Sequence, residues 1–216
     1  MKAVTPLLAS AALVAMVGAN AQVVGSTVSP DPGPFLTLTA AGLAPSGSFA
    51  GAALVGGTVL GSDQAFADMP KGAGAATVGN FLAAGPTAGS PATLTFVAPV
   101  KDVSFLWGSP DLYNLLTVTT TAGTQTFVAD PSLANAAAAS LGFAQATGNQ
   151  DFSQYVHLVA QGSSSILSLR FDNAPPVDAF EASNFRVTLI PEPETYALML
   201  AGLGVVGLIA RRRRPA

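Results

Sequence analysis

The fold class is decided by the stretch Leu115-Leu-Thr-Val-Thr-Thr-Thr-Ala-Gly-Thr-Gln-Thr-Phe-Val128. Leu116 and Val118 share one face of this stretch and threonines occupy the other, which is the period of two typical of a half-buried β-strand. Ala122-Gly123 supplies a turn, and the run from Thr124 to Val128 is again rich in β-branched and aromatic residues. The stretch therefore predicts a β-hairpin.

The same period of two continues on both sides of the hairpin. Trp107 alternates in phase with Phe105, so we expect Trp107 in the core. Many short strands joined by turns rich in Gly and Pro predict a mainly β domain, specifically an antiparallel β-sandwich of the jelly-roll type. Apolar residues share a strand face at Leu94 and Phe96, at Val103, Phe105 and Trp107, at Phe152, Val156 and Leu158, at Leu167, Leu169 and Phe171, and at Phe185, Val187 and Leu189.

Two stretches give other predictions. Residues 35–90 are rich in Ala, Gly and Pro, and they predict either weak edge strands or mobile loops. A short helix is predicted over residues 133–141, because this segment is alanine-rich, Asp130 can cap it and Pro131 suits its first turn.

The composition excludes several classes of function. Cysteine is absent, so the chain has no disulfide, no thiolate zinc site and no cysteine nucleophile. Residues 22–190 contain ten acidic residues, all between Asp31 and Glu181, and four basic ones, Lys71, Lys101, Arg170 and Arg186, which makes this middle part acidic. An acidic surface lacks the basic patch that nucleic acid binding requires, so we expect no nucleic acid partner.

The N-terminal segment predicts export. Met1-Lys2 is followed by an apolar run to Gly18 and then by Ala19-Asn20-Ala21, in which Ala19 and Ala21 form the small-residue pattern cut by signal peptidase. We therefore expect a signal peptide over residues 1–21 and an exported domain over residues 22–190.

The C-terminal segment predicts a membrane anchor over residues 191–216. Pro191, Glu192 and Pro193 precede an apolar run from Tyr196 to Ala210, and Arg211, Arg212, Arg213 and Arg214 follow it. As a helix the run would be roughly 22 Å long, against a hydrocarbon core of about 30 Å, so we expect a short single transmembrane helix. The arginines should stop transfer and stay on the cytoplasmic side.

These three elements together resemble the sorting signal of PEP-CTERM proteins. The resemblance covers only this tail. It implies recognition by an exosortase, a membrane enzyme that cuts near the motif after transient anchoring in the inner membrane. It further implies a final location at the cell surface or in the extracellular matrix of a Gram-negative bacterium that makes exopolysaccharide. A plain C-terminal anchor with a proline-rich stalk is the alternative interpretation.

No catalytic constellation is recognisable in the exported part. His157 is the only histidine, and its place within a predicted strand favours a structural role. The stretch from Phe105 to Asn114 is similar to an element found in some exosortase-dependent surface proteins, and its turn offers Asp111, Tyr113 and Asn114 as ligand contacts. No cofactor is expected. A calcium site could be built from Asp172, Asp178 and Glu181, although turn chemistry explains these residues equally well.

Three functions are compatible with these features. The first is a non-catalytic surface or matrix protein that associates with exopolysaccharide. The second is a carbohydrate-active enzyme on the same β-sandwich, which would need a pair of carboxylates in a cleft. The third is a self-assembling adhesin or coat subunit.

Overall fold

The computed structural model describes residues 23–28, 33–72, 75–135, 137–143, 145–173, 177–189, 199 and 201–203. The predicted signal peptide, the Pro191–Pro193 triplet and the four terminal arginines lie outside these residues. Within the predicted membrane helix, Met199 and residues 201–203 are helical. The part of the chain that the structure describes contains no helix with the length and apolarity to span a bilayer.

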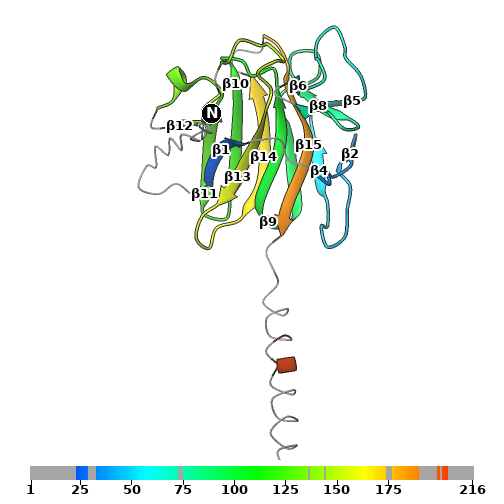
Figure 1. Cartoon of the computed structure of the whole chain (residues 1–216), viewed down its shortest axis with the longest axis vertical. Coiled ribbons are helices and arrows are strands. Elements are labelled where there is room, and N and C mark those ends of the chain that lie inside the picture. Colours follow the sequence, from blue (N-terminus) through cyan, green and yellow to red (C-terminus); the bar gives the residue numbers. More distant parts are fainter. Residues whose placement is uncertain are drawn as a thin grey trace, which may run out of the picture.

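The domain is mainly β, as predicted: strands make up most of the regular secondary structure of the described residues (Figure 1). Among the residues that the structure describes, one 3₁₀ turn, η1 (Pro131–Leu133), lies between these strands. The strands are β1 (Val23–Val28), β2 (Leu38–Thr39), β3 (Gly42–Leu43), β4 (Ala52–Val55), β5 (Thr58–Leu60), β6 (Lys71–Gly72), β7 (Ala75–Ala76), β8 (Phe81–Ala84), β9 (Ala92–Gly108), β10 (Asn114–Thr120), β11 (Gly123–Val128), β12 (Ala138–Ser140), β13 (Gln154–Ala160), β14 (Ile166–Asn173) and β15 (Phe180–Leu189).

Thirteen of the strands form one mostly antiparallel sheet, and β6 pairs with β7 separately. The long strand β9 holds this sheet together because it has four partners. Its first part pairs with β4 and β14, and its second part pairs with β13 and β15. The register of both β14 and β15 shifts along β9, at Ile166/Ser168 and at Ser183/Arg186. The central position of β9 (Figure 1) thus links strands that are far apart in the sequence.

One large core is shared by strands on both parts of β9. The aromatic rings at its centre touch across elements: Phe171 of β14 makes edge contacts with Phe105 of β9 and with Phe180 of β15, at centroid distances of 5.6 and 5.1 Å. Trp107 is fully buried and stacks on Phe180 at 4.1 Å, which confirms its predicted place in the core. A fully buried aromatic side chain stabilises a fold by several kcal/mol, roughly 3–5 kcal/mol by truncation. These rings are therefore the main packing contacts between β9, β14 and β15.

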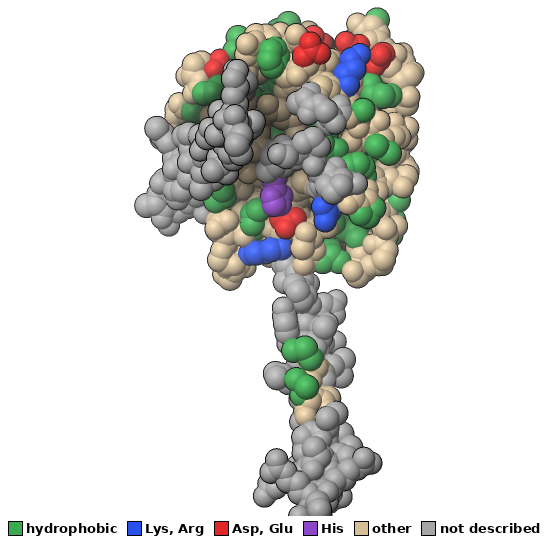
Figure 2. All heavy atoms as spheres, viewed as in Figure 1, with side chains coloured by type: hydrophobic (Ala, Val, Ile, Leu, Met, Phe, Trp, Pro, Cys, Tyr) green, Lys and Arg blue, Asp and Glu red, His purple; other side chains and the backbone are tan. Residues whose placement is uncertain are grey.

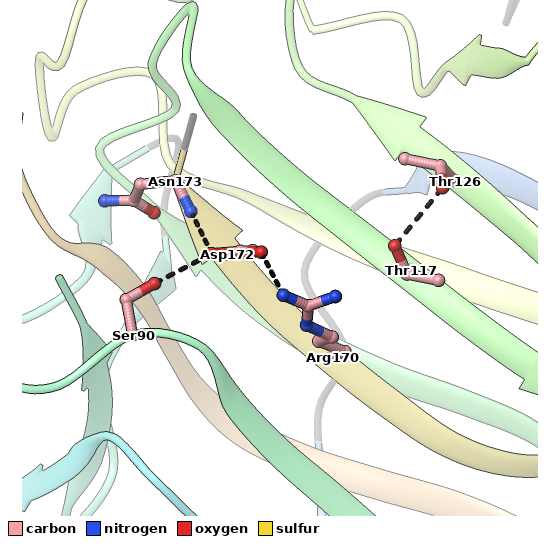
Figure 3. Close-up of polar contacts among 6 residues, drawn as sticks. All are labelled: Ser90, Thr117, Thr126, Arg170, Asp172 and Asn173. Atoms are coloured by element: carbon pink, nitrogen blue, oxygen red, sulfur yellow. Dashed lines mark hydrogen bonds and ion pairs between the residues drawn. The ribbon is translucent and has the colours of Figure 1, made fainter. Parts of the chain in front are cut away.

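The hairpin predicted over residues 115–128 is present as β10 and β11. Leu116 and Val118 are buried, and Thr117 and Thr119, which alternate with them, are partly exposed on the other face, as the period of two predicts. On the outer face the Thr117 and Thr126 hydroxyls lie 3.2 Å apart across the pair (Figure 3). This hydrogen bond is a cross-strand contact of the kind that stabilises sheets.

The predicted helix over residues 133–141 is wrong. Asp130 does cap a turn, since its carboxylate accepts a hydrogen bond from the Ser132 amide at 2.7 Å, but only the 3₁₀ turn η1 follows. The Asn135 side chain then accepts hydrogen bonds from two backbone amides, and Ala138–Ser140 becomes β12, parallel to β11. The open edge of β11 has overridden the helix propensity of the alanines.

Residues 35–90, for which edge strands or loops were predicted, contain the short strands β2 to β8. Strand β8 is more central than this prediction implied, because its four residues are fully buried between β5 and β15. Along β14 the register shift buries Ile166 and leaves Leu167 partly exposed, so Leu167 does not share the inner face of Leu169 and Phe171 as predicted.

The two ends of the sheet differ in what they carry. We call the end where β9 stops at Gly108 and β15 begins at Phe180 the loop end, and the end where β15 stops at Leu189 the tail end. With ten residues in β15, the two ends are roughly 30 Å apart at the usual rise of a strand.

Candidate ligand-binding end and sorting motif

The loop end brings together connections that are distant in the sequence. The turn between β9 and β10 meets the segment before β13, where Asp111 bridges Thr147 and the Gly148 amide donates to the Pro110 carbonyl at 3.0 Å. Gly148 has a positive φ of 72°, and a Cβ there would lie 2.7 Å from Asp111 Oδ1. Glycine thus allows the backbone to approach this carboxyl group closely.

Asn114, predicted as a ligand contact, is a buried structural residue. Its Oδ1 accepts hydrogen bonds from the Asp111 amide at 3.0 Å and from Trp107 Nε1 at 3.4 Å. Its Nδ2 donates to Asn173 Oδ1 at 3.5 Å, and Asn173 Nδ2 donates in turn to the Asp178 carbonyl. This chain of amides ties the Asp111 turn to the loop before β15. Because Asn114 is fully buried, the ligand contact assigned to it is not available.

Asp111 and Tyr113, the other predicted contacts, lie side by side but differ in exposure. The Asp111 side chain is buried, whereas Tyr113 is partly exposed. Burial raises the pKa of Asp111 to about 6; the charge of Asp178 adds to this rise, and a hydrogen bond from Tyr113 opposes it. Burial and the neighbouring charges of Asp111 and Asp178 raise the pKa of Tyr113 to about 12. The region is therefore strongly electronegative.

Glu181 lies at the loop end but was not among the predicted ligand contacts. It is only 2% exposed, and Ser109 Oγ donates to its Oε2 at 2.5 Å. Burial raises the pKa of Glu181 well above its ordinary value; the hydrogen bond from Ser109 opposes this rise, and the charges of Asp178 and Asp111 reinforce it. The signal in the sequence is a glutamate between the apolar residues Phe180 and Ala182. Its partner Ser109, however, is 72 positions away in the chain.

The calcium set suggested by the sequence is not assembled in the described residues. The Asp172 carboxylate has other partners: it accepts hydrogen bonds from Arg170 at 2.5 Å and from the Ser90 hydroxyl at 2.9 Å (Figure 3). Asp178 and Glu181 do lie at the loop end together with Asp111. Within the described ranges, no three side chains of the His, Cys, Asp or Glu type are grouped to hold a metal ion.

His157 has the structural environment expected of a strand histidine. Its Nε2 lies 3.6 Å from Asp102 Oδ1 on the adjacent strand β9. A histidine, an acidic side chain and basic side chains gather on this face of the domain (Figure 2). Burial opposes the ionisation of Asp102, but hydrogen bonds from His157 and Thr188 and the nearby charges lower its pKa overall. The pair therefore links β13 to β9, and the strand register places Ser104 of β9 and Ser26 of β1 opposite His157.

The strand β15 runs from the loop end to Leu189 at the tail end, and the Pro-Glu-Pro triplet follows after one intervening residue, Ile190. A family model described as the PEP-CTERM protein-sorting motif matches residues 189–214. The chain carries a PEP-CTERM sorting motif. The resemblance drawn from the triplet, the apolar run and the arginines is thus confirmed.

The PEP-CTERM motif supports export, exosortase as a partner, and a surface or extracellular location. It begins on the last residue of a strand that is hydrogen-bonded to β9, so it follows the folded domain without a long linker. No curated protein and no solved structure shows a significant match to the chain. The motif therefore informs on sorting and not on the role of the domain.

Proposed function

We propose that this protein is a non-catalytic surface or matrix protein that associates with exopolysaccharide after exosortase processing. The observation that carries the proposal is the position of the PEP-CTERM motif, which starts where β15 ends. Cleavage near the triplet would leave β15 whole, and signal peptidase cleavage after Ala21 would leave β1, which begins at Val23, whole as well. Both processing steps are thus compatible with a folded domain.

This position also orients the domain. A protein held through its C-terminus near Leu189 would present the opposite end of the sheet outward, at roughly 30 Å from the attachment point. We interpret the sheet as a rigid scaffold of the predicted β-sandwich type, since strands on both parts of β9 share one core. Leu112 and Val177, which are 52% and 62% exposed, and the partly exposed Tyr113 stand at that outward end. Apolar and aromatic faces of this kind suit the apolar faces of sugars.

A carbohydrate-active enzyme is the second candidate, because Asp111 and Glu181 both have raised pKa values at the same end. A general acid in a glycosidase needs such a pKa, but it must also reach the glycosidic oxygen. Glu181 is 2% exposed and already bound by Ser109, so it has no access to a polymer. Its raised pKa is better explained by burial, and we favour the non-catalytic role.

The test is retention of the protein in the matrix of cells that do or do not make exopolysaccharide. We expect the processed protein in the matrix fraction of the producing strain and in the medium of a strain that lacks the polymer. Tyr113→Ala should reduce retention severalfold, whereas Leu133→Ala, which truncates another exposed apolar residue beside β12, should not. Equal retention in both strains would contradict the proposal, and hydrolysis of the polymer that is lost in Glu181→Gln would support the enzyme instead.

A further inference from the structure

The loop end contains a buried oxygen that the protein itself does not satisfy. Asp111 is 5% exposed, and its Oδ2 is the one buried side-chain nitrogen or oxygen without a hydrogen-bond partner in the described part of the chain. Leaving a carboxylate oxygen buried and unpaired is costly, so native structures usually satisfy such atoms with water, an ion or a proton.

The fold ties the backbone of a second acidic residue, Asp178, to the turn that holds this oxygen, and the charge of Asp178 acts on the Asp111 carboxyl. The amide chain from the Asp111 backbone through Asn114 and Asn173 ends on the carbonyl of Asp178. Asp178 is exposed, and its Oδ1 accepts a hydrogen bond from the Ala179 amide at 2.8 Å. Asparagine side chains that are fully bonded on both sides fix the separation of the two turns. The two acids therefore belong to one preorganised arrangement.

Among the described groups that act on the Asp111 and Glu181 carboxyls, none is a cation. The groups that act on the Asp111 carboxyl are burial, the negative charge of Asp178 and the hydrogen bond from Tyr113, and Asp178 and Asp111 likewise raise the pKa of buried Glu181. The ion pairs His157–Asp102 and Arg170–Asp172 lie elsewhere in the domain. An external cation would complete this environment.

We propose that the loop end binds one Ca²⁺ ion, with Asp111 Oδ2 as the buried ligand and Asp178 as the second carboxylate. Calcium takes six to eight oxygen ligands in flexible geometry and accepts carbonyls and waters beside carboxylates. Since the described residues offer no group of three acidic or histidine ligands, carbonyl oxygens and water supply the remaining positions. Such sites bind in the range of about 10⁻⁴–10⁻³ M, as extracellular calcium modules do. The inference is independent of exopolysaccharide binding and of sorting.

Trp107 provides a built-in reporter, because its indole donates to the same Asn114 oxygen that accepts from the Asp111 amide. The experiment is a calcium titration of the full-length protein in detergent, after EDTA treatment, followed by Trp107 fluorescence and thermal unfolding. At 10 mM CaCl₂ we expect a saturable fluorescence change and a rise in Tm of about 3–10 °C. NaCl at equal ionic strength should produce neither effect.

Three variants separate a site from general charge screening. Asp111→Asn should abolish the calcium-dependent rise, and Asp178→Asn, whose exposed side chain makes unfolding of the variant less of a concern, should weaken binding at least tenfold. Asp130→Asn, which alters the cap of η1, should respond as the native protein does. A native Tm that does not change with calcium, or an equal rise in Asp111→Asn or with NaCl, would overturn the proposal and leave a protonated Asp111 as the explanation.

Discussion

Glu181 should make the domain less stable as the pH rises, and Glu181→Gln should remove this effect. The folded state raises the pKa of this carboxyl above its ordinary 4.5, through burial first and then through the charges of Asp178 and Asp111. Between the unfolded and the folded pKa the native state therefore holds a proton that the unfolded state has released. The contribution of Glu181 to the free energy of unfolding therefore decreases as the pH rises from about 4.5 toward the folded pKa. Below about pH 4.5 this contribution is constant.

The size of the effect is set by the single proton involved. One proton difference corresponds to about 1.4 kcal/mol per pH unit at most, which is about 3–5 °C in Tm for a domain of this size. We expect Tm of the native protein to fall by up to this amount per pH unit relative to Glu181→Gln, starting near pH 5. Thermal unfolding followed by Trp107 fluorescence, in EDTA to remove any bound cation, measures the difference.

Asp151→Asn is the matched control, since Asp151 is an exposed acid in the segment before β13 at the same end of the sheet. Its profile should remain parallel to that of the native protein. If the Glu181→Gln profile is also parallel to the native one, Glu181 is charged in the folded state over this pH range. That result would refute the claim that the buried Glu181 carboxyl retains its proton above about pH 5.

Further predictions concern packing and charge. Phe171→Ala should lower the free energy of unfolding by about 3–5 kcal/mol, because its ring contacts β9 and β15 at once, whereas Val97→Ala, at a position 68% exposed, should change it by less than about 0.5 kcal/mol in urea unfolding. Equal effects would contradict a shared core. Asp102→Asn should cost at most about 1 kcal/mol at pH 7, and this difference should vanish as the pH falls through the lowered pKa of Asp102, since the carboxylate that pairs with His157 is then protonated in both states. Gly148→Ala should destabilise by about 1–3 kcal/mol through its positive φ and the contact with Asp111, as thermal unfolding at constant pH would show.

Local features of the fold could be predicted because they depend on neighbours in the sequence. The hairpin of residues 115–128 has its period and its turn in one short stretch, and the buried face of β9 around Trp107 follows from alternation. The four partners of β9 could not be predicted, because pairing over long distances leaves no local signal. The prediction of a helix over residues 133–141 was wrong for a related reason. The edge of β11, with which β12 pairs, cannot be recognised from the sequence.

The candidate site shows the same division. The turn that offers Asp111, Tyr113 and Asn114 was predicted from the similarity of residues 105–114 to an element of some exosortase-dependent surface proteins. Burial of Asn114 could not be foreseen, because it depends on Asn173 from another strand. The Ser109–Glu181 contact likewise joins two elements that only the folded sheet brings together.

The central claim is that this chain is exported and processed at both ends around an intact β-domain, and intact mass spectrometry of surface and culture fractions tests it most directly. The account predicts a species that begins at Gln22 and ends between Pro191 and Thr195. Such a species retains β1 and β15 in full. A species in the inner membrane that still carries Arg211 to Arg214 would contradict it, and would mean an ordinary anchored protein.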